Sequence, residues 1–132
     1  GDVRDPDTGE KIAGVRALVG SLAHTVEVLL GGFAHMPLAR TNTTISCVVT
    51  NARLSKAQAT KVAQMAADAY AHAITPTHTT NDGDTVFVMA TGEVDAPVDV
   101  VGSLATRALG RAIADGARSA TSAYGYVAAR DL

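Results

Sequence analysis

The sequence predicts an α/β protein, because two apolar, β-branched runs alternate with two long helical patterns from residue 43 onward. Residues 43–50 form the first run, and residues 84–91, which are rich in valine, form the second. A helical pattern follows each run. The expected order of elements is therefore strand, helix, strand, helix.

The first 42 residues are predicted to be mostly irregular. Residues 1–20 contain Asp-Pro, Asp-Thr-Gly and further glycines, and we expect an extended arm that packs against a preceding portion of the protein. Residues 21–30 are consistent with a short helix that stops at two glycines. Residues 33–42, with Pro37, are predicted to form a mobile linker in front of Thr43.

The helix between the two strands has a clear start signal. Ser55 and Gln58 have the spacing of a capping box, so the helix is expected to begin at this point. It should end before Pro76, because the residue ahead of a proline disfavours helical geometry. Its predicted buried face follows a spacing of three and four: Val62, Met65, Ala66, Ala69, Tyr70, Ala73 and Ile74.

The second strand is expected to end in a turn over residues 92–97, followed by a helix over residues 98–122. A glycine inside a helix costs about 1 kcal/mol relative to alanine unless it permits tight packing. This helix contains three such positions: Gly102, Gly110 and Gly116.

Composition is that of one globular domain of 132 residues, with 47% hydrophobic residues and a net charge of -2. The 11 lysines and arginines are scattered, which does not favour binding to nucleic acid or to an anionic membrane. No apolar run approaches the ~20 residues that span a bilayer. The single cysteine, Cys47, excludes an intrachain disulfide framework and fits a reducing compartment, so we predict a cytoplasmic location.

Thr43 is the first candidate for chemistry. A threonine hydroxyl at this strand start can attack the carbonyl of Asn42, break the chain and emerge as a new N-terminus. Its α-amine, with a pKa of ~7.7–8.0, then supplies a general base. An ordinary β-branched strand edge is the alternative interpretation.

Ser46 and Cys47 also have side chains that can act as nucleophiles, but both lie inside the alternating run. We expect Cys47 to be a buried small hydrophobe.

The second candidate is Asp82-Gly83-Asp84, where two carboxylates flank a glycine at the mouth of the second strand. Gly83 allows a tight turn in which both side chains can converge. If the two strands run parallel, their entry ends bring Thr43 close to Asp82 and Asp84. A solvated turn is the competing interpretation.

Together these motifs resemble a known family. The chain is similar to the self-processing N-terminal-nucleophile aminopeptidases, which include L-aminopeptidase D-Ala-esterase/amidase, the β-peptidyl aminopeptidases and the nylon-oligomer endo-hydrolases. The motifs that carry the resemblance are Asn42-Thr43-Thr44-Ile45, the helix start at residues 54–59, His78-Thr79 and the segment 82–87. The Asn-Thr junction and Asp-Gly-Asp favour the nylon-hydrolase side, because the aminopeptidase side typically has a serine nucleophile and a Ser-x-Glu pair.

The resemblance implies cleavage between Asn42 and Thr43, with Thr43 as nucleophile and Asp82 and Asp84 orienting its amine and hydroxyl. It implies an α/β/β/α four-layer sandwich to which this chain supplies a strand-helix-strand-helix unit. Residues 1–42 would end the N-terminal portion and link it to the cleavage site, and residues 43–132 would form the nucleophile-bearing fragment. A larger N-terminal portion, absent here, would supply an oxyanion-stabilising asparagine.

On this resemblance the protein hydrolyses small aminoacyl amides, peptides or nylon-type oligoamides without a cofactor, as a homo-oligomer of four or more copies. Two other functions stay open: an acyltransferase of the ornithine acetyltransferase type, and a cleaved but non-catalytic scaffold. A metal site built from His35, His72 and His78 with the two aspartates is disfavoured, because the chain has no His-x-x-x-His or Cys-x-x-Cys pair.

Overall fold

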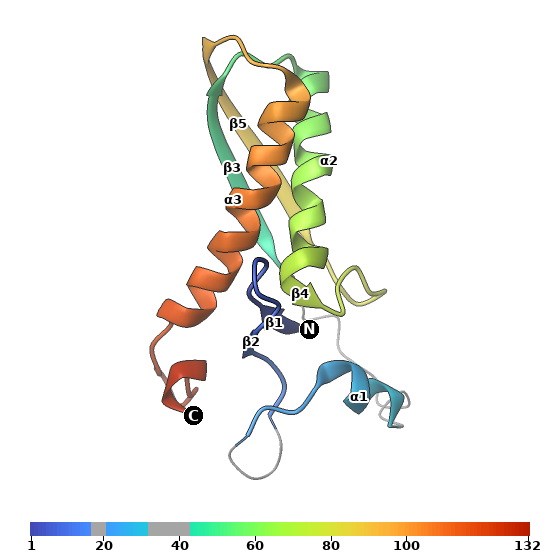
Figure 1. The fold of residues 1–132 in the computed structure, drawn as a ribbon, viewed down its shortest axis with the longest axis vertical. Coiled ribbons are helices and arrows are strands. Elements are labelled where there is room, and N and C mark those ends of the chain that lie inside the picture. The colour runs from blue at the N-terminus through green and yellow to red at the C-terminus, as the bar shows by residue number, and fades with distance from the viewer. Residues whose placement is uncertain (17–20, 32–42) are drawn as a thin grey trace.

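The computed structural model describes residues 1–16, 21–31 and 43–132. From residue 43 onward the elements follow the predicted order of strand, helix, strand and helix (Figure 1). One short strand is added between the first of these two helices and the second long strand. The chain is therefore a mixed α/β structure, as the sequence predicts. In chain order these elements are β3 (Ile45–Ala52), α2 (Lys56–Ala73), β4 (Ile74–Thr75), β5 (Thr85–Val94) and α3 (Val98–Ser119).

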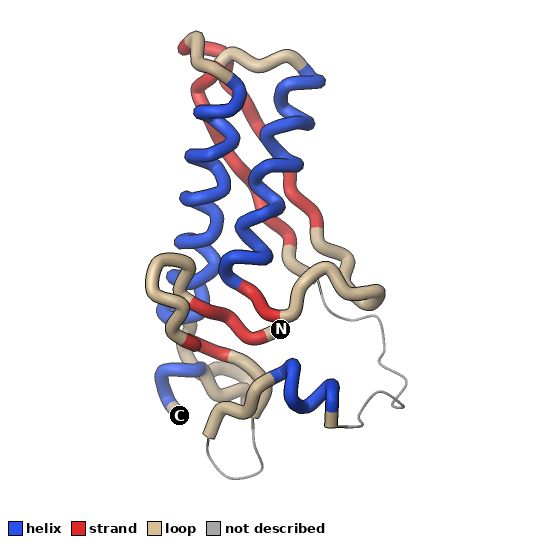
Figure 2. The backbone as a smooth tube through the Cα atoms, turned by 45° about the vertical axis from the view of Figure 1, so that its right-hand side comes forward, coloured by secondary structure: helices blue, strands red, loops and turns tan. Residues whose placement is uncertain are grey.

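β3 and β5 form a parallel pair in which Ile45 is opposite Thr85. α2 and α3 lie side by side on one face of this pair (Figure 2). Side chains alternate along a strand, so every second residue of β3 points at the helices. The core that results between the helices and the strands is made largely of small residues: Ala52, Val62, Ala66, Ala69, Tyr70, Val101, Ala105 and Leu109.

α2 begins as predicted. The Ser55 side chain accepts a hydrogen bond from the backbone N–H of Gln58, and the Gln58 side chain accepts one from the backbone N–H of Ser55. Five of the predicted buried positions of this helix are buried. Met65 is half-buried, and Ile74 belongs to β4 because the helix ends one residue earlier.

The glycines of α3 differ in their surroundings. A Cβ on Gly102 would collide with the Met65 side chain, and a Cβ on Gly110 would lie 3.5 Å from Pro6. Gly102 therefore permits close packing, whereas a side chain at Gly110 would make only an ordinary van der Waals contact. A Cβ on Gly116 would meet open space. Tight packing therefore does not offset the helix-propensity cost of this glycine.

Two predicted boundaries are wrong. The turn expected at residues 92–97 begins later, because β5 continues to Val94. The strand passes through Gly92, whose φ of 80° is a conformation that glycine adopts readily. The pairing shifts there, and Ala52 lies opposite Val94. α3 ends at Ser119 instead of residue 122.

The N-terminal residues are more ordered than the predicted extended arm. β1 (Asp2–Arg4) and β2 (Lys11–Ala13) form an antiparallel hairpin, and β4 pairs with β1 to give a second sheet of order β2-β1-β4. The hairpin turn is closed by Asp5, whose carboxylate accepts the backbone N–H groups of Asp7 and Thr8. Asp-Pro-Asp-Thr-Gly is therefore a compact turn.

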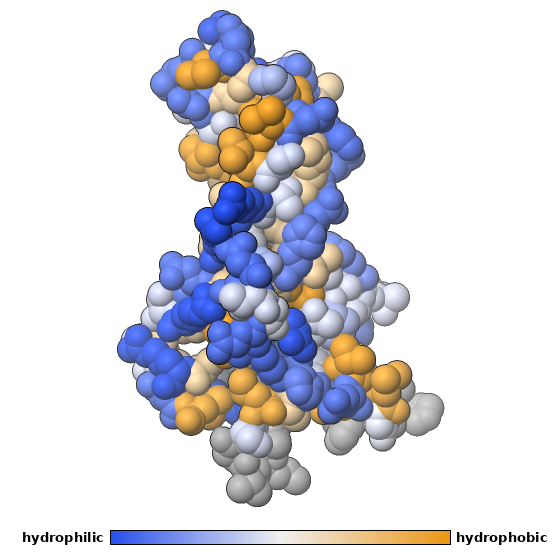
Figure 3. Space-filling model, in the orientation of Figure 1, coloured by the Kyte–Doolittle hydropathy of each residue, from blue (hydrophilic) through white to orange (hydrophobic). Residues whose placement is uncertain are grey.

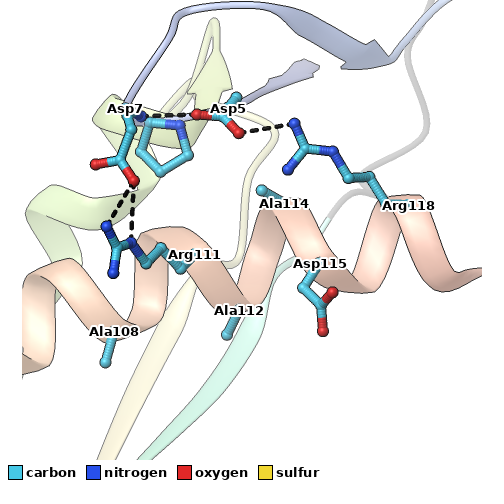
Figure 4. Close-up of a pocket in the computed structure, with 9 residues that line it drawn as sticks. Asp5, Asp7, Ala108, Arg111, Ala112, Ala114, Asp115 and Arg118 are labelled. Atoms are coloured by element: carbon cyan, nitrogen blue, oxygen red, sulfur yellow. Dashed lines mark hydrogen bonds and ion pairs between the residues drawn. The ribbon is translucent and has the colours of Figure 1, made fainter.

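Two ion pairs attach this turn to α3 (Figure 4). The Arg118 guanidinium donates to Asp5 at 2.7 Å, and the Arg111 guanidinium donates to Asp7 at 2.8 Å. The hydrogen bond from Arg118, with those from the backbone of Thr8 and Asp7, lowers the pKa of Asp5 to about 2. The hairpin therefore packs on this chain's own helix.

α1 (Thr25–Leu30) is shorter than the predicted helix and begins beside the buried Asp2 carboxylate, which accepts the Thr25 backbone N–H at 3.1 Å. Residues 33–42, predicted to be a linker, lie outside the described residues. A short 3-10 helix, η2 (Ala129–Asp131), follows α3. Within the described ranges, no helix has both the length and the apolar character that a bilayer crossing requires.

Candidate active site

The starts of β3 and β5 lie next to each other at the lower end of the long strand pair (Figure 1). The backbone N–H of Thr85 donates to the carbonyl of Thr44 at 3.0 Å, immediately before the first paired residues of the two strands. The strands run parallel, which is the condition under which the sequence predicts that Thr43 approaches the two aspartates. The parallel pair thus brings the residues at the two entry ends together.

Thr43 lies against Gly83. A Cβ placed on Gly83 would be 2.9 Å from the Thr43 Oγ1 atom, closer than a real Cβ is found. Gly83 therefore permits close approach of the threonine hydroxyl. The sequence predicts that Gly83 is needed for a tight turn. In the structure, its lack of a side chain is what allows Thr43 to lie so close.

Asp84 faces the start of β3. Its Oδ1 accepts the backbone N–H of Thr44 at 2.8 Å, and its Oδ2 accepts the hydroxyl of Thr77 at 3.3 Å. The side chain of Asp84 is only 10% exposed. This carboxylate is thus held by two donors, one of which belongs to the residue directly after Thr43.

Asp82 has a different environment. Its Oδ2 accepts the backbone N–H of Thr79 at 2.7 Å, while its own backbone N–H donates to the Thr79 carbonyl at 3.1 Å. These two bonds close the loop that precedes β5. Asp82 therefore shapes the loop, whereas Asp84 contacts β3 directly.

Among the described residues, His78 is the histidine that lies beside Asp84. Its Nδ1 lies 3.8 Å from Asp84 Oδ2, and its ring centroid lies 5.9 Å from that of Tyr70. His72 is exposed in the last turn of α2, and His35 is outside the described residues. Across the described part of the chain, no group of three or more histidine, cysteine or acidic side chains could hold a metal ion.

The structure also places Tyr70 at the site, which the sequence indicates only as a buried position of α2. Its hydroxyl lies 2.8 Å from the Ser46 hydroxyl, beneath the starts of both strands. A tyrosine on an otherwise apolar buried helix face could have indicated a polar contact at this position, because a buried phenol needs a hydrogen-bond partner.

The prediction that Cys47 is buried is wrong. It is exposed, whereas Ser46 is buried. The reason is the alternation of side chains along β3: even-numbered residues face the helices, and odd-numbered residues point away from them. Cys47 therefore lies on the opposite face of the strand pair.

Comparisons with known proteins give a consistent result. The chain is 34% identical to an uncharacterized aminopeptidase of Mycobacterium tuberculosis over an alignment of 157 positions, which covers 100% of this chain and 44% of the relative. It is 51% identical over 69 residues to an uncharacterized aminopeptidase of Mycobacterium leprae, which covers 51% of this chain and 19% of the relative.

A third relative is the 6-aminohexanoate-oligomer endohydrolase of Paenarthrobacter ureafaciens. The match is 43% identical over 56 residues and covers 42% of this chain and 16% of the relative. The chain thus spans less than half the length of these relatives. The model of peptidase family S58 matches residues 7–129, nearly the whole chain. On this match the chain belongs to peptidase family S58.

Proposed function

We propose that this chain carries the nucleophile of a self-cleaving amide hydrolase, and that the nucleophile is the hydroxyl of Thr43. The observation that supports this most is the convergence of Thr43, Gly83 and Asp84 at the entry ends of two parallel strands. A close-fitting glycine leaves room for the threonine hydroxyl, and a nearly buried carboxylate fixes the adjacent backbone.

Self-cleavage begins when Thr43 Oγ1 attacks the carbonyl carbon of Asn42, which itself lies outside the described residues. The peptide C–N bond breaks as the C–O ester bond forms, and the hydroxyl proton passes to the departing nitrogen. Water then hydrolyses the ester. This leaves Asn42 with a carboxylate and Thr43 with a free α-amine.

In turnover the α-amine of Thr43 takes the proton from its own hydroxyl as the hydroxyl oxygen attacks a substrate amide. The proton passes to the leaving amine, and water releases the acyl group from the ester. Asp84 orients the new amine, because a carboxylate beside an ammonium group stabilises its charged form. Asp82 acts less directly, by holding the loop that positions Asp84.

The names of the relatives support amide substrates and hydrolysis. Two are called aminopeptidases, and the third is called an endohydrolase of 6-aminohexanoate oligomers. Transfer of the acyl group to an amine instead of water is the alternative. An assay that includes an added amine acceptor distinguishes the two outcomes.

We also infer that another part of the polypeptide covers the outer face of the β3–β5 pair. This face exposes Ile45, Val49, Phe87 and Met89 by 58–72%. Apolar surface also extends over the upper half of α3 beside β3 (Figure 3). A contiguous apolar surface of this kind is costly in water. The relatives have more than twice the length of this chain, which leaves enough residues for a second sheet and helix layer, completing an α/β/β/α sandwich.

The test uses the full polypeptide that contains these residues, with an aminoacyl p-nitroanilide as substrate. Thr43→Ala should leave the precursor uncut and abolish hydrolysis. Thr60→Ala removes an exposed hydroxyl of α2, on the side of the strand pair away from the face proposed to be covered, and should change neither rate. Normal processing and turnover in Thr43→Ala would refute the proposed nucleophile.

A further inference from the structure

Tyr70 lies on the buried side of α2, near the end of the helix that is closest to the site. It is 1% exposed and is among the largest fully buried side chains of the described residues. Most of its neighbours on the same face are alanines and Val62. An apolar ring of the same size would fill this space, so packing alone does not account for the phenol hydroxyl.

The Tyr70 hydroxyl contacts both strands. It lies 2.8 Å from Ser46 Oγ, 3.2 Å from the Thr44 carbonyl oxygen and 3.1 Å from the Thr85 carbonyl oxygen. A phenol has one hydrogen to donate and can accept a second bond. When Ser46 donates to Tyr70 Oη, the single hydrogen of the phenol is shared between the carbonyl oxygens of Thr44 and Thr85. The buried hydroxyls of Tyr70 and Ser46 thus form one small network.

The two carbonyls belong to the residues directly after Thr43 and Asp84. Thr44 is held on both sides of its backbone, because its N–H donates to Asp84 and its carbonyl lies within reach of Tyr70. Thr85 is joined to Thr44 by a backbone hydrogen bond and to Tyr70 by its carbonyl. One buried hydroxyl therefore connects the chain next to the nucleophile with the chain next to the carboxylate.

We propose that Tyr70 is a positioning residue, whose hydroxyl fixes the separation of Thr43 and Asp84 from beneath the strand starts. This inference rests on the proposed role of Thr43. Small errors in such a separation have large kinetic effects, because a displacement of ~1 Å can slow a reaction by ~10²-fold.

The environment keeps the phenol in its donating form. Burial raises the pKa of Tyr70, the hydrogen bond with Ser46 lowers it, and the negative charge of Asp84 raises it again, so that the net shift is upward. The hydroxyl therefore remains protonated at neutral pH. It acts through its hydrogen bonds to the backbone carbonyls of Thr44 and Thr85.

The experiment compares Tyr70→Phe with the parent in the full polypeptide that contains this chain. The rate of self-cleavage is followed by intact mass, which needs no knowledge of the substrate, and kcat and KM are measured on an aminoacyl p-nitroanilide. We expect both self-cleavage and kcat to fall at least about tenfold, with KM changed less than about twofold.

Two control variants separate positioning from general loss of stability. Val62→Ala, on the same buried face of α2 but closer to its start, should lower the melting temperature and leave kcat of the folded enzyme unchanged. Tyr126→Phe removes the hydroxyl of an exposed tyrosine and should change neither. If Tyr70→Phe only lowers the melting temperature, as Val62→Ala does, the positioning role is wrong.

Comparison with Thr43→Ala separates failure of the inference about Tyr70 from failure of the proposed nucleophile. If Thr43→Ala is inactive and Tyr70→Phe keeps the parent rates, the inference about Tyr70 fails and the proposed nucleophile stands. If Thr43→Ala keeps the parent rates, both fail. Should Tyr70→Phe not fold, Ser46→Ala decides: several-fold slower self-cleavage supports the network, and an unchanged rate overturns it.

Discussion

The backbone N–H of Thr44 donates a 2.8 Å hydrogen bond to Oδ1 of Asp84, across 40 positions of sequence. This bond fixes the carboxylate at the start of the neighbouring strand, beside the residue proposed as nucleophile. A solvated turn would leave Asp84 exposed and without such a partner, whereas its side chain is 10% exposed. The geometry therefore favours a positioned carboxylate.

Asp84→Asn should lower turnover at least about a hundredfold while the protein stays folded. The amide keeps an oxygen that can accept the Thr44 N–H, but it lacks the charge that would hold an ammonium at Thr43. The measurement is kcat on an aminoacyl p-nitroanilide alongside thermal melting. Asp82→Asn is the matched comparison, and we expect a smaller effect because its carboxylate bonds to the loop backbone. Near-parent turnover in both variants would show that the aspartates have no role in the chemistry.

Gly102→Ala should be clearly less stable than Gly116→Ala. A methyl group at Gly102 would force Met65 to move, which should offset the gain of about 1 kcal/mol in helix propensity. The same change at Gly116 meets open space and should stabilise the fold by about 0.5–1 kcal/mol, because alanine has the higher helix propensity. Urea unfolding of the two variants measures the difference. Equal effects would mean that α3 does not pack on α2 as described.

The buried Asp2 should make stability depend on pH. Burial alone raises the pKa of Asp2, but hydrogen bonds from Thr25 and the ammonium of Lys11 outweigh it, and the net shift is downward. The folded pKa therefore lies below the unfolded value of ~3.9. The stabilisation is present above about pH 4 and is lost as pH falls through the folded pKa.

Asp2→Asn should cost about 1–3 kcal/mol at pH 7, because it leaves Lys11 and Thr25 with a poorer acceptor. It should also flatten the fall in stability that the parent shows below about pH 4. Unfolding curves at several pH values measure both effects. A variant with the same acid dependence as the parent would show that Asp2 is not the group responsible.

Cys47 reports on the outer face of the β3–β5 pair. It is exposed in these 132 residues, but the proposed second sheet would cover it in the full polypeptide. A bulky thiol reagent should then react with it slowly in the native state and rapidly after denaturation. Rapid labelling of the native, full polypeptide would contradict the four-layer arrangement.

The strand-helix-strand-helix order was predictable from local signals. The capping box at Ser55 and Gln58 and the proline at position 76 act within a few residues, and they fix the ends of α2. The approach of Thr43 to Asp84 was predictable only on the condition of parallel strands. That condition depends on the crossover through α2, which no short window of sequence contains.

Other features depend on long-range packing. The face on which Cys47 lies is decided by whether odd or even residues of β3 meet the helices, and an apolar run on both faces leaves that choice open. The hairpin of β1 and β2 forms on α3 through Asp5 and Arg118, which are 113 residues apart. The Tyr70 network likewise joins three elements that only the fold brings together.

The most direct test of the central claim is N-terminal sequencing of the fragments that the purified full polypeptide yields, combined with their intact masses. The account predicts a fragment that begins at Thr43 and that is absent from the Thr43→Ala variant. A fragment that begins at Thr44, Ser46 or Cys47, or one that forms equally in Thr43→Ala, would contradict it.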